Sequence, residues 1–428
     1  MKNENLNYFS YFCSMLINEK TWQFIREHAD EDVRKVALQG VKDADVDLQM
    51  ALQQIAGRQT ARRKLPSWTA VEGIIYPPHL NMEQCSSEQT ARYKAELVMG
   101  DRCWVVADGV SFVDLTGGFG VDFYWIAKAI SHHPSPTTHH PTYLEQNKEL
   151  CAISSHNFRV LGLDCSACCC DAVTYLTTMP HVALIYMDPA RRNEHGGRTY
   201  GIADCSPNVL ELLPLLMSKA DRVLLKLSPM LDWRKAVEDL KYVTEVHIVS
   251  VGNECKELLL LLDKKGAEDL RVVCVNFTKD REQLFETSYG GQPPCSGHHI
   301  SPLLPLSPSH FLYEPNASIM KAGCFAEVEQ RYPVQQISQN SHLFLSSVEI
   351  EDFPGRVFLI LSISSMNKQE LRTALKEIER ANISVRNFPL SVDQLRKKLK
   401  LKDGGDVYIF ATTMADGEHR LLICRKIG

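Results

Sequence analysis

The sequence contains no apolar run long enough to cross a lipid bilayer. The longest run, Val182–Met187, has six residues and Leu258–Leu262 has five, whereas a membrane-spanning helix needs about 20. The stretch before Tyr8 is polar and lacks the basic segment that leads into the apolar core of a secretory signal. We therefore expect a cytoplasmic protein that has no membrane partner.

Strong net charge and internal repeats are also missing. The 47 Lys and Arg residues against 52 Asp and Glu leave a net charge of −5 over 428 residues, so no global positive field attracts nucleic acid, and any such binding must be local. The 14 cysteines make up about 3% of a long chain, and with no export signal we interpret them as buried small side chains or free thiols rather than as a disulfide framework. The length itself predicts more than one hydrophobic core.

The pattern of apolar residues divides the chain into regions. Between residues 14 and 64 apolar positions recur at helical spacing, and this region ends in a basic cluster that we interpret as a solvated helix face rather than a phosphate site. The cluster consists of Arg58, Arg62, Arg63 and Lys64. From Phe112 onward, short apolar runs alternate with helix-like stretches, which is typical of a parallel sheet covered on both faces. The expected strands lie near 111–114, 142–144, 168–170, 182–187 and 223–227, and the expected helices at 119–130, 147–157, 208–217 and 231–240.

The later part of the chain changes character twice. Strands at Glu245–Val251 and Lys256–Leu262 are joined by only four residues, too few for a parallel crossover, so they should pair antiparallel. Residues 288–310 are rich in Gly and Pro and are typical of a connection. The elements expected beyond it are a strand at 357–363, a helix at 368–380, a second helix from residue 391 and a strand at 407–412, which together indicate a small α+β domain.

The segment Phe112–Asp122, read F-V-D-L-T-G-G-F-G-V-D, has the most informative local pattern. A strand ending at Asp114 is followed by a glycine-rich turn and then a helix, and such a turn lets a ligand approach the backbone at a helix N-terminus. Gly117, Gly118 and Gly120 do not continue to the third glycine of G-x-G-x-x-G, which disfavours dinucleotide binding.

Carboxylates follow the next three expected strands. Glu145, Asp171 and Asp188 come after the second, third and fourth strands, and the carboxyl ends of strands in a doubly wound sheet line one crevice. Glu145 is placed to accept both hydroxyls of a ribose, and Asp171 to accept from an adenine amine. The sequence therefore predicts an adenosine-containing ligand.

These residues resemble a known family. D-L-T-G-G-F-G-V-D is similar to the first motif of class I S-adenosylmethionine-dependent methyltransferases, and Glu145 to their second acidic position. Segments 83–94, 188–192, 226–229, 353–356 and 385–389 resemble a bacterial methyltransferase group that has a ferredoxin-like segment and a THUMP-like C-terminal domain. The resemblance implies S-adenosyl-L-methionine as cofactor. The cofactor residues implied are Asp114, Thr116, Gly117, Gly118, Gly120, Asp122, Glu145 and Asp171.

The resemblance also implies a fold and its domains. We expect an α/β protein with a doubly wound, seven-stranded, Rossmann-like methyltransferase sheet, a helical N-terminal region and a small α+β C-terminal domain. The expected domains are a helical region at 1–105, a methyltransferase domain at 106–278, a ferredoxin-like segment and linker at 279–345, and a THUMP-like domain at 346–428.

Asp188-Pro189 occupies the place where nucleic-acid amine methyltransferases carry their catalytic D/N-P-P-Y/F motif. Here Ala190 and Arg191 replace the second proline and the aromatic residue, so the usual stacking platform is absent. Arg191 and Arg192 are candidate substrate clamps, because a guanidinium stacks on a base or forks onto a phosphate; a structural ion pair is the alternative. Lys226 is a further candidate, although a lysine at a strand end is more often exposed to solvent.

Other reaction classes fit the sequence less well. D-P-A-R resembles the motif of RNA 5-methyluridine methyltransferases, but Lys226-Leu-Ser-Pro229 offers no nucleophilic Cys, which disfavours covalent carbon-5 chemistry. The Cys165–Cys170 segment contains one C-x-x-C but no second ligand pair, so we expect no obligate metal.

The C-terminal segment from Ala381 is locally basic, with nine Lys and Arg residues against five Asp and Glu. A basic patch beside a catalytic domain is typical of docking to an RNA backbone, and the THUMP resemblance implies the same; an ordinary charged helix is the alternative. The candidate RNA-binding residues are Arg386, Arg396, Lys397, Lys398 and Lys400. The favoured function is methylation of structured RNA such as tRNA or rRNA. The alternatives are a protein or small-molecule methyltransferase, and a non-catalytic RNA-binding protein with a vestigial cofactor fold.

Overall fold

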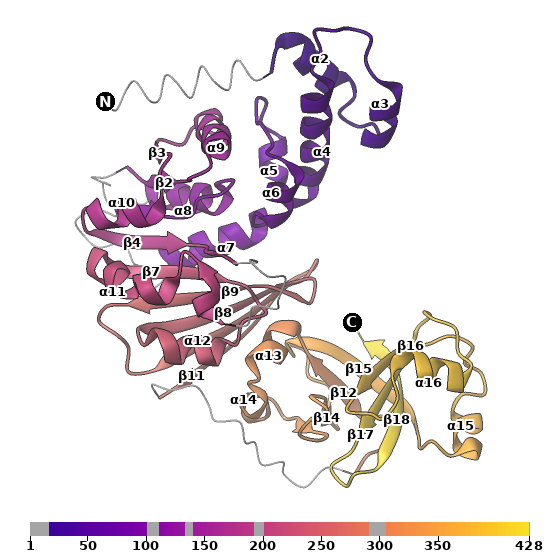
Figure 1. Ribbon diagram of the computed structural model, residues 1–428. Coiled ribbons are helices and arrows are strands. Elements are labelled where there is room, and N and C mark those ends of the chain that lie inside the picture. Colours follow the sequence, from indigo (N-terminus) through magenta and orange to yellow (C-terminus); the bar gives the residue numbers. More distant parts are fainter. Residues whose placement is uncertain (1–16, 101–110, 133–139, 192–200, 291–304, 428) are drawn as a thin grey trace. The chain divides into compact units, whose positions relative to one another are not determined.

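The computed structural model describes residues 17–100, 111–132, 140–191, 201–290 and 305–427 (Figure 1). The backbone contacts divide the chain into two compact units. The first contains residues 1–244 and 260–267, and the second contains residues 245–259 and 268–428.

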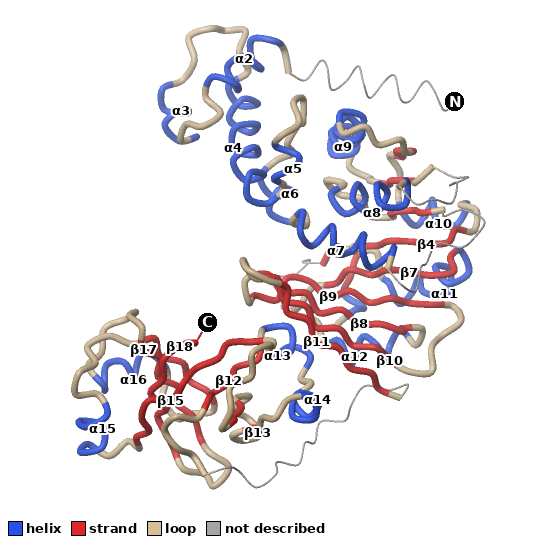
Figure 2. Tube along the Cα trace, turned by 180° about the vertical axis from the view of Figure 1, so that it is seen from behind, coloured by secondary structure: helices blue, strands red, loops and turns tan. Residues whose placement is uncertain are grey.

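Helices fill the N-terminal part of the first unit, as predicted. They are α2 (Glu19–Glu27), α3 (Val33–Gln39), α4 (Leu48–Lys64), α5 (Pro66–Thr69), α6 (His79–Gln84) and α7 (Glu88–Met99). Asn18, Asp32 and Asp47 begin the first three helices, and each side chain accepts a hydrogen bond from a backbone N–H of the first turn. Helix α4 packs against α2, α5 and α6 (Figure 2).

The basic end of α4 makes contacts within the protein. The Lys64 ammonium donates to the backbone carbonyls of Met82, at 2.8 Å, and Glu83, at 2.6 Å, in the last turn of α6. Arg62 forms an ion pair with Asp30. These two members of the predicted solvated cluster therefore hold neighbouring segments onto α4.

Strands and helices alternate after residue 111, which confirms the predicted doubly wound arrangement. In chain order they are β1 (Phe112–Asp114), α8 (Val121–Ser131), β2 (Thr142–Leu144), α9 (Lys148–Val160), β3 (Ser166–Cys168), α10 (Ala172–Thr178), β4 (Val182–Met187), α11 (Val209–Lys219), β7 (Ala220–Leu227), α12 (Trp233–Leu240), β8 (Val243–Val251) and β9 (Glu254–Asp263). A short ribbon of β5 (Ala190–Arg191) and β6 (Cys205–Ser206), with a 3-10 turn at Ile202–Asp204, lies between β4 and α11. The third strand covers 166–168, not the expected 168–170.

The predicted seven-stranded sheet is present as β8-β9-β7-β4-β1-β2-β3, and two further strands extend it at the β8 edge. The sheet has the order β11-β10-β8-β9-β7-β4-β1-β2-β3, with nine strands among the described residues. The two additional strands, β10 (Leu270–Phe277) and β11 (Glu282–Tyr289), form an antiparallel hairpin whose first strand pairs parallel with β8. β8 and β9 are neighbours joined by Gly252 and Asn253, which both have positive φ, and such a two-residue turn makes the pair antiparallel, as predicted.

The second unit also contains a seven-stranded sheet, ordered β13-β14-β12-β15-β18-β17-β16. Its elements are β12 (Phe311–Pro315), α13 (Ala317–Ala322), α14 (Phe325–Arg331), β13 (Gln335–Gln336), β14 (Phe344–Ser346), β15 (Gly355–Ser364), α15 (Lys368–Ala374), β16 (Asn382–Arg386), α16 (Val392–Leu399), β17 (Val407–Thr413) and β18 (His419–Ile427). The small α+β C-terminal domain is therefore confirmed, but the helix expected at 368–380 ends at Ala374 and is followed by turns.

Candidate active site

Three glycines after β1 serve different purposes. A Cβ at Gly117 would lie 2.1 Å from the Tyr143 ring, and one at Gly120 would lie 2.4 Å from the Phe158 ring, so both glycines are required by packing against β2 and α9. Gly118 has φ +55°, and the nearest atom to an added Cβ is the Thr116 carbonyl oxygen at 3.9 Å. Gly118 therefore presents bare backbone to open space at the carboxyl end of β1.

Glu145, after β2, lies against this turn. Its Oε2 accepts the Gly118 N–H at 2.9 Å, and its Oε1 accepts the Asn147 N–H at 2.8 Å. Tyr143 donates its hydroxyl to the Gly118 carbonyl at 2.5 Å. Because each carboxylate oxygen can accept two hydrogen bonds, Glu145 keeps capacity for two further donors while it fixes the turn.

Asp114, the last residue of β1, is fully buried. Its Oδ1 accepts the Thr116 N–H at 2.9 Å, but its Oδ2 has no hydrogen-bond partner in the part of the chain that the structure describes. Burial raises the pKa of Asp114 well above its ordinary value, and the carboxylates of Asp122 and Asp188 add to this effect. A buried oxygen without a partner is costly, and in a native protein it commonly indicates a missing water or ligand.

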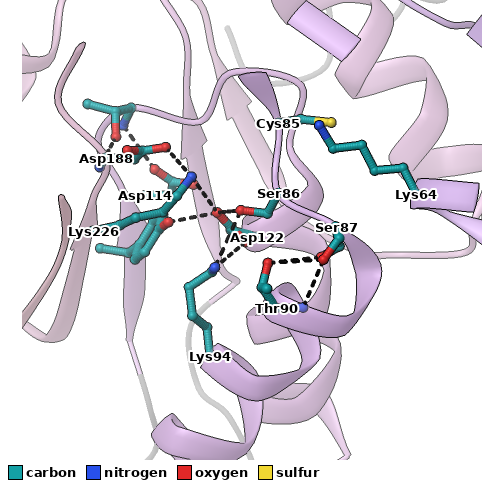
Figure 3. Close-up of polar contacts among 12 residues, drawn as sticks. Lys64, Cys85, Ser86, Ser87, Thr90, Lys94, Asp114, Asp122, Asp188 and Lys226 are labelled. Atoms are coloured by element: carbon teal, nitrogen blue, oxygen red, sulfur yellow. Dashed lines mark hydrogen bonds and ion pairs between the residues drawn. The ribbon is translucent and has the colours of Figure 1, made fainter. Parts of the chain in front are cut away.

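Asp188 and Lys226 form the next part of the site (Figure 3). Asp188, directly after β4, donates its backbone N–H to the Thr116 hydroxyl at 2.6 Å. Lys226, near the end of β7, donates to Asp188 Oδ2 at 2.6 Å. The Lys226 side chain is only 12% exposed, so the expectation of an ordinary solvent-exposed strand-end lysine is wrong. Its charge is needed inside the site because two carboxylates face it.

Asp122, in the first turn of α8, lies at the centre of a buried polar network. Its Oδ2 accepts hydrogen bonds from Ser86, at 2.8 Å, and Tyr186, at 2.7 Å, and lies 3.6 Å from the Lys226 ammonium. The Lys94 ammonium lies 3.2 Å from Asp122 Oδ1. Burial alone would raise the pKa of Asp122, but the two ammonium groups and the two hydroxyls outweigh it and hold that pKa below its ordinary value.

Sequence reasoning did not single out Lys94, Ser86 or Tyr186 as site residues. A signal for Lys94 is present, because it falls on the same helical stripe as the small or apolar residues Ala91, Ala95 and Val98. A lysine on a buried stripe usually has a buried carboxylate as partner.

The remaining candidates are placed as follows. Asp171 begins α10 and accepts the Thr174 N–H at 2.8 Å. Pro189 is buried, the Arg191 backbone pairs with Cys205 in the β5–β6 ribbon, and Arg192 lies outside the described residues. Within the described ranges, no group of three or more His, Cys, Asp or Glu is arranged to hold a metal ion. None of the helices described there is both long and apolar enough to span a bilayer.

Two of the candidate RNA-binding residues have partners within the second unit. Arg386 donates to Glu314 Oε1 at 2.7 Å, and Glu314 is buried and also paired with Arg356. Arg396 donates to the Ala381 carbonyl at 3.0 Å and to Asp403 Oδ1 at 2.6 Å. Lys397, Lys398 and Lys400, at the end of α16, are exposed.

The C-terminal segments match two described families. Residues 311–354 match a ferredoxin-like domain, and residues 355–426 match a domain described as THUMP domain-like. A solved structure of a proposed methyltransferase from Porphyromonas gingivalis W83 is 29% identical, with 100% of both chains covered and a TM-score of 0.78. This chain has a doubly wound methyltransferase fold followed by ferredoxin-like and THUMP-like domains. The matched segments begin later than the expected boundaries at residues 279 and 346.

Two other solved structures align with part of the chain. A proposed class I S-adenosylmethionine-dependent methyltransferase from Listeria monocytogenes is 12% identical, with 59% of this chain and 83% of that chain covered and a TM-score of 0.36. A proposed RNA methyltransferase from Pyrococcus horikoshii is 13% identical, with 46% and 96% covered and a TM-score of 0.32. No curated protein sequence matches the chain.

The two C-terminal segments are not separate bodies in this protein. β12, from the ferredoxin-like segment, pairs antiparallel with β15, the first strand of the THUMP-like segment. Both segments therefore contribute to the seven-stranded sheet, and the Glu314 ion pairs with Arg356 and Arg386 connect them through side chains.

Proposed function

We propose that this protein is an S-adenosylmethionine-dependent methyltransferase whose substrate is structured RNA. The observation that carries the cofactor assignment is the turn at Gly118, where bare backbone at φ +55° lies beside the Glu145 carboxylate. The unpartnered Oδ2 of Asp114 supports the same assignment, since it offers a buried acceptor at the carboxyl end of β1.

Three carboxylates of the described residues can accept hydrogen bonds from the polar groups of the cofactor. Glu145 would accept the two ribose hydroxyls, Asp171 the adenine amine, and Asp114 the cofactor's ammonium group. Gly118 allows close approach of the ligand to the backbone, because a side chain there would fill the same space. When bound, S-adenosylmethionine supplies a methyl group on a positively charged sulfur.

For the transfer itself, the protein mainly has to align the substrate. Methyl transfer is an in-line displacement, so fixing the attacking atom supplies much of the rate enhancement. Asp188 would accept a hydrogen bond from the attacking group, and the ion pair with Lys226 at 2.6 Å limits the directions in which its carboxylate can point. The Thr116 hydroxyl, which accepts the Asp188 N–H, ties this residue to the cofactor turn.

The RNA assignment rests on the C-terminal domain. The THUMP-like match covers residues 355–426. THUMP domains occur in RNA-modifying enzymes, as the sequence resemblance implies. Three exposed lysines at the end of α16 are available to bind phosphates, namely Lys397, Lys398 and Lys400. Arg386 and Arg396 instead form ion pairs within the second unit, with Glu314 and Asp403.

Replacing Lys397, Lys398 and Lys400 together by Ala should weaken RNA binding and reduce its salt dependence. The log–log slope of affinity against salt should fall by about 0.7 for each single-strand phosphate that the variant no longer neutralises. Filter binding of bulk tRNA and rRNA at several salt concentrations measures this. The matched control replaces three exposed lysines of the α/β region, namely Lys241 after α12 and Lys264 and Lys265 in the turn after β9. An unchanged slope in the α16 variant would refute this docking site.

Replacing Glu145 by Ala should weaken S-adenosylmethionine binding by about 1.5–3 kcal/mol, or roughly 10- to 150-fold, because acceptors for two hydroxyls are removed. Calorimetric titration of the folded variant measures the change. Glu149→Ala, an exposed carboxylate in the first turn of α9, is the control. Equal affinities of the Glu145 variant and the wild type would remove Glu145 from the site.

The proposed function is tested by mass spectrometry of nucleosides from RNA of cells that lack the gene. We expect one methylated nucleoside to be missing and to return when the gene is restored. An unchanged nucleoside profile, with cofactor binding intact, would favour a protein or small-molecule substrate. An unchanged profile without cofactor binding would favour a vestigial cofactor fold.

A further inference from the structure

Lys94 is a fully buried lysine outside the sheet, on the N-terminal helix α7. Its ammonium lies 3.3 Å from the Ser86 hydroxyl and 3.2 Å from Asp122 Oδ1. Burying an ammonium is costly even when it is paired, and a well-packed apolar side chain is often at least as stable. The charge of Lys94 therefore calls for an explanation other than stability.

Four charged groups alternate in sign from Lys94 to the mouth of the site (Figure 3). Lys94 faces Asp122, Asp122 Oδ2 lies 3.6 Å from the Lys226 ammonium, and that ammonium lies 2.6 Å from Asp188 Oδ2. Lys226 is thus shared by two carboxylates and lies 1.0 Å closer to Asp188 than to Asp122. The relative pull of these two carboxylates determines where the ammonium lies.

We propose that Lys94 is a positioning residue for Asp188. By balancing the charge of Asp122, Lys94 lets Lys226 remain on Asp188 and hold that carboxylate in place. Asp122 faces two ammonium groups, those of Lys94 and Lys226. Without Lys94, Asp122 would attract Lys226 away from Asp188, because charges attract more strongly in a poorly solvated interior than in water. This inference rests on the role proposed for Asp188 in methyl transfer.

The same contacts connect the helical N-terminal region to the site. Glu88, in the first turn of α7, accepts hydrogen bonds from the Ser67 N–H at 2.9 Å and the Ser67 hydroxyl at 2.7 Å. Ser86, just before α7, donates to Asp122 at 2.8 Å. The start of α7, and with it Lys94, is therefore fixed by Ser67 of the helical N-terminal region and by Asp122 of α8.

The test compares Lys94→Met with the double variant Lys94→Met/Asp122→Asn. In the single variant, the Lys226–Asp188 contact should lengthen beyond hydrogen-bond distance in a crystal structure. Transfer of tritiated methyl groups to total RNA from cells lacking the gene should fall about 10- to 100-fold at saturating cofactor, as expected for a displaced aligning group. Affinity for S-adenosylmethionine should stay within threefold, roughly 0.65 kcal/mol, because the Lys94 ammonium contacts Ser86 and Asp122, whereas the proposed cofactor acceptors are Glu145, Asp171 and Asp114. In the double variant, the neutral amide at position 122 no longer competes for Lys226, so the Lys226–Asp188 contact should return to hydrogen-bond distance and the transfer rate at saturating cofactor should rise above that of Lys94→Met.

Arg92→Met is the matched control, since Arg92 is a cation on the same helix that pairs with Glu88 instead. If Lys94→Met does not fold, Lys94→Gln removes the charge but keeps a donor for Ser86. An unchanged Lys226–Asp188 contact in the folded single variant would overturn the proposal, as would a double variant in which that contact stays broken or the rate at saturating cofactor does not exceed that of Lys94→Met. If the wild type transfers no methyl group to RNA, the proposed substrate fails, while the crystal structures still decide the role of Lys94.

Discussion

Asp188→Ala should lower methyl transfer by about 100-fold or more while cofactor affinity changes only a few-fold. A group that acts mainly on alignment in the transition state contributes to the rate and little to ground-state binding. The structure gives this expectation a geometric basis, because Asp188 is 37% exposed and its carboxylate is held by Lys226 at 2.6 Å. Single-turnover transfer to RNA and calorimetric titration of the cofactor measure the two quantities separately.

Asp164→Ala is the control for this prediction, since Asp164 is an exposed carboxylate just before β3, at the opposite end of the strands from the site. It should leave both rate and affinity unchanged. If Asp188→Ala instead lost affinity and rate to the same extent, Asp188 would be a cofactor ligand and not an aligning group.

Gly118→Val should weaken S-adenosylmethionine binding by about 100-fold or more, equivalent to about 2.7 kcal/mol. An added Cβ meets no protein atom closer than 3.9 Å, so the side chain would enter the space assigned to the cofactor. Gly117 and Gly120 are unsuitable for this test, because a Cβ at either would collide with an aromatic ring and disturb the fold.

Gly162→Val is the matched control for Gly118→Val. Gly162 follows α9, has φ +71° and has no atom within 4 Å of an added Cβ, so valine there suffers similar backbone strain away from the site. The two variants should have comparable thermal stability, and only Gly118→Val should lose binding. Retained affinity in a folded Gly118→Val variant would show that the cofactor does not lie against this turn.

The α/β region could be predicted because its signals are local. The strands at 142–144 and 182–187 have the predicted bounds, since each is a short apolar run bounded by polar or turn residues. The glycine turn was recognisable because only glycine satisfies its packing and backbone angles. The hairpin β10–β11 was missed because Leu270–Phe277 follows an antiparallel pair, and its parallel partner β8 lies two strands back in the chain.

The charge network could not be predicted to the same extent. Lys226 and Arg386 look like ordinary surface cations in the sequence, and only the fold brings Asp188 and Glu314 against them. Lys94 and Asp122 are 28 residues apart and come from different helices. Periodicity identifies the buried stripe of α7, but it does not identify which carboxylate a buried lysine meets.

Calorimetric titration of S-adenosylmethionine into the intact chain tests most directly whether the cofactor binds against Gly118, Glu145 and Asp114. We expect saturable binding at one site per chain, weakened by about 100-fold or more in Gly118→Val and retained in Asp188→Ala and Gly162→Val. Absence of binding to the folded wild-type protein, or identical binding by Gly118→Val, would contradict it.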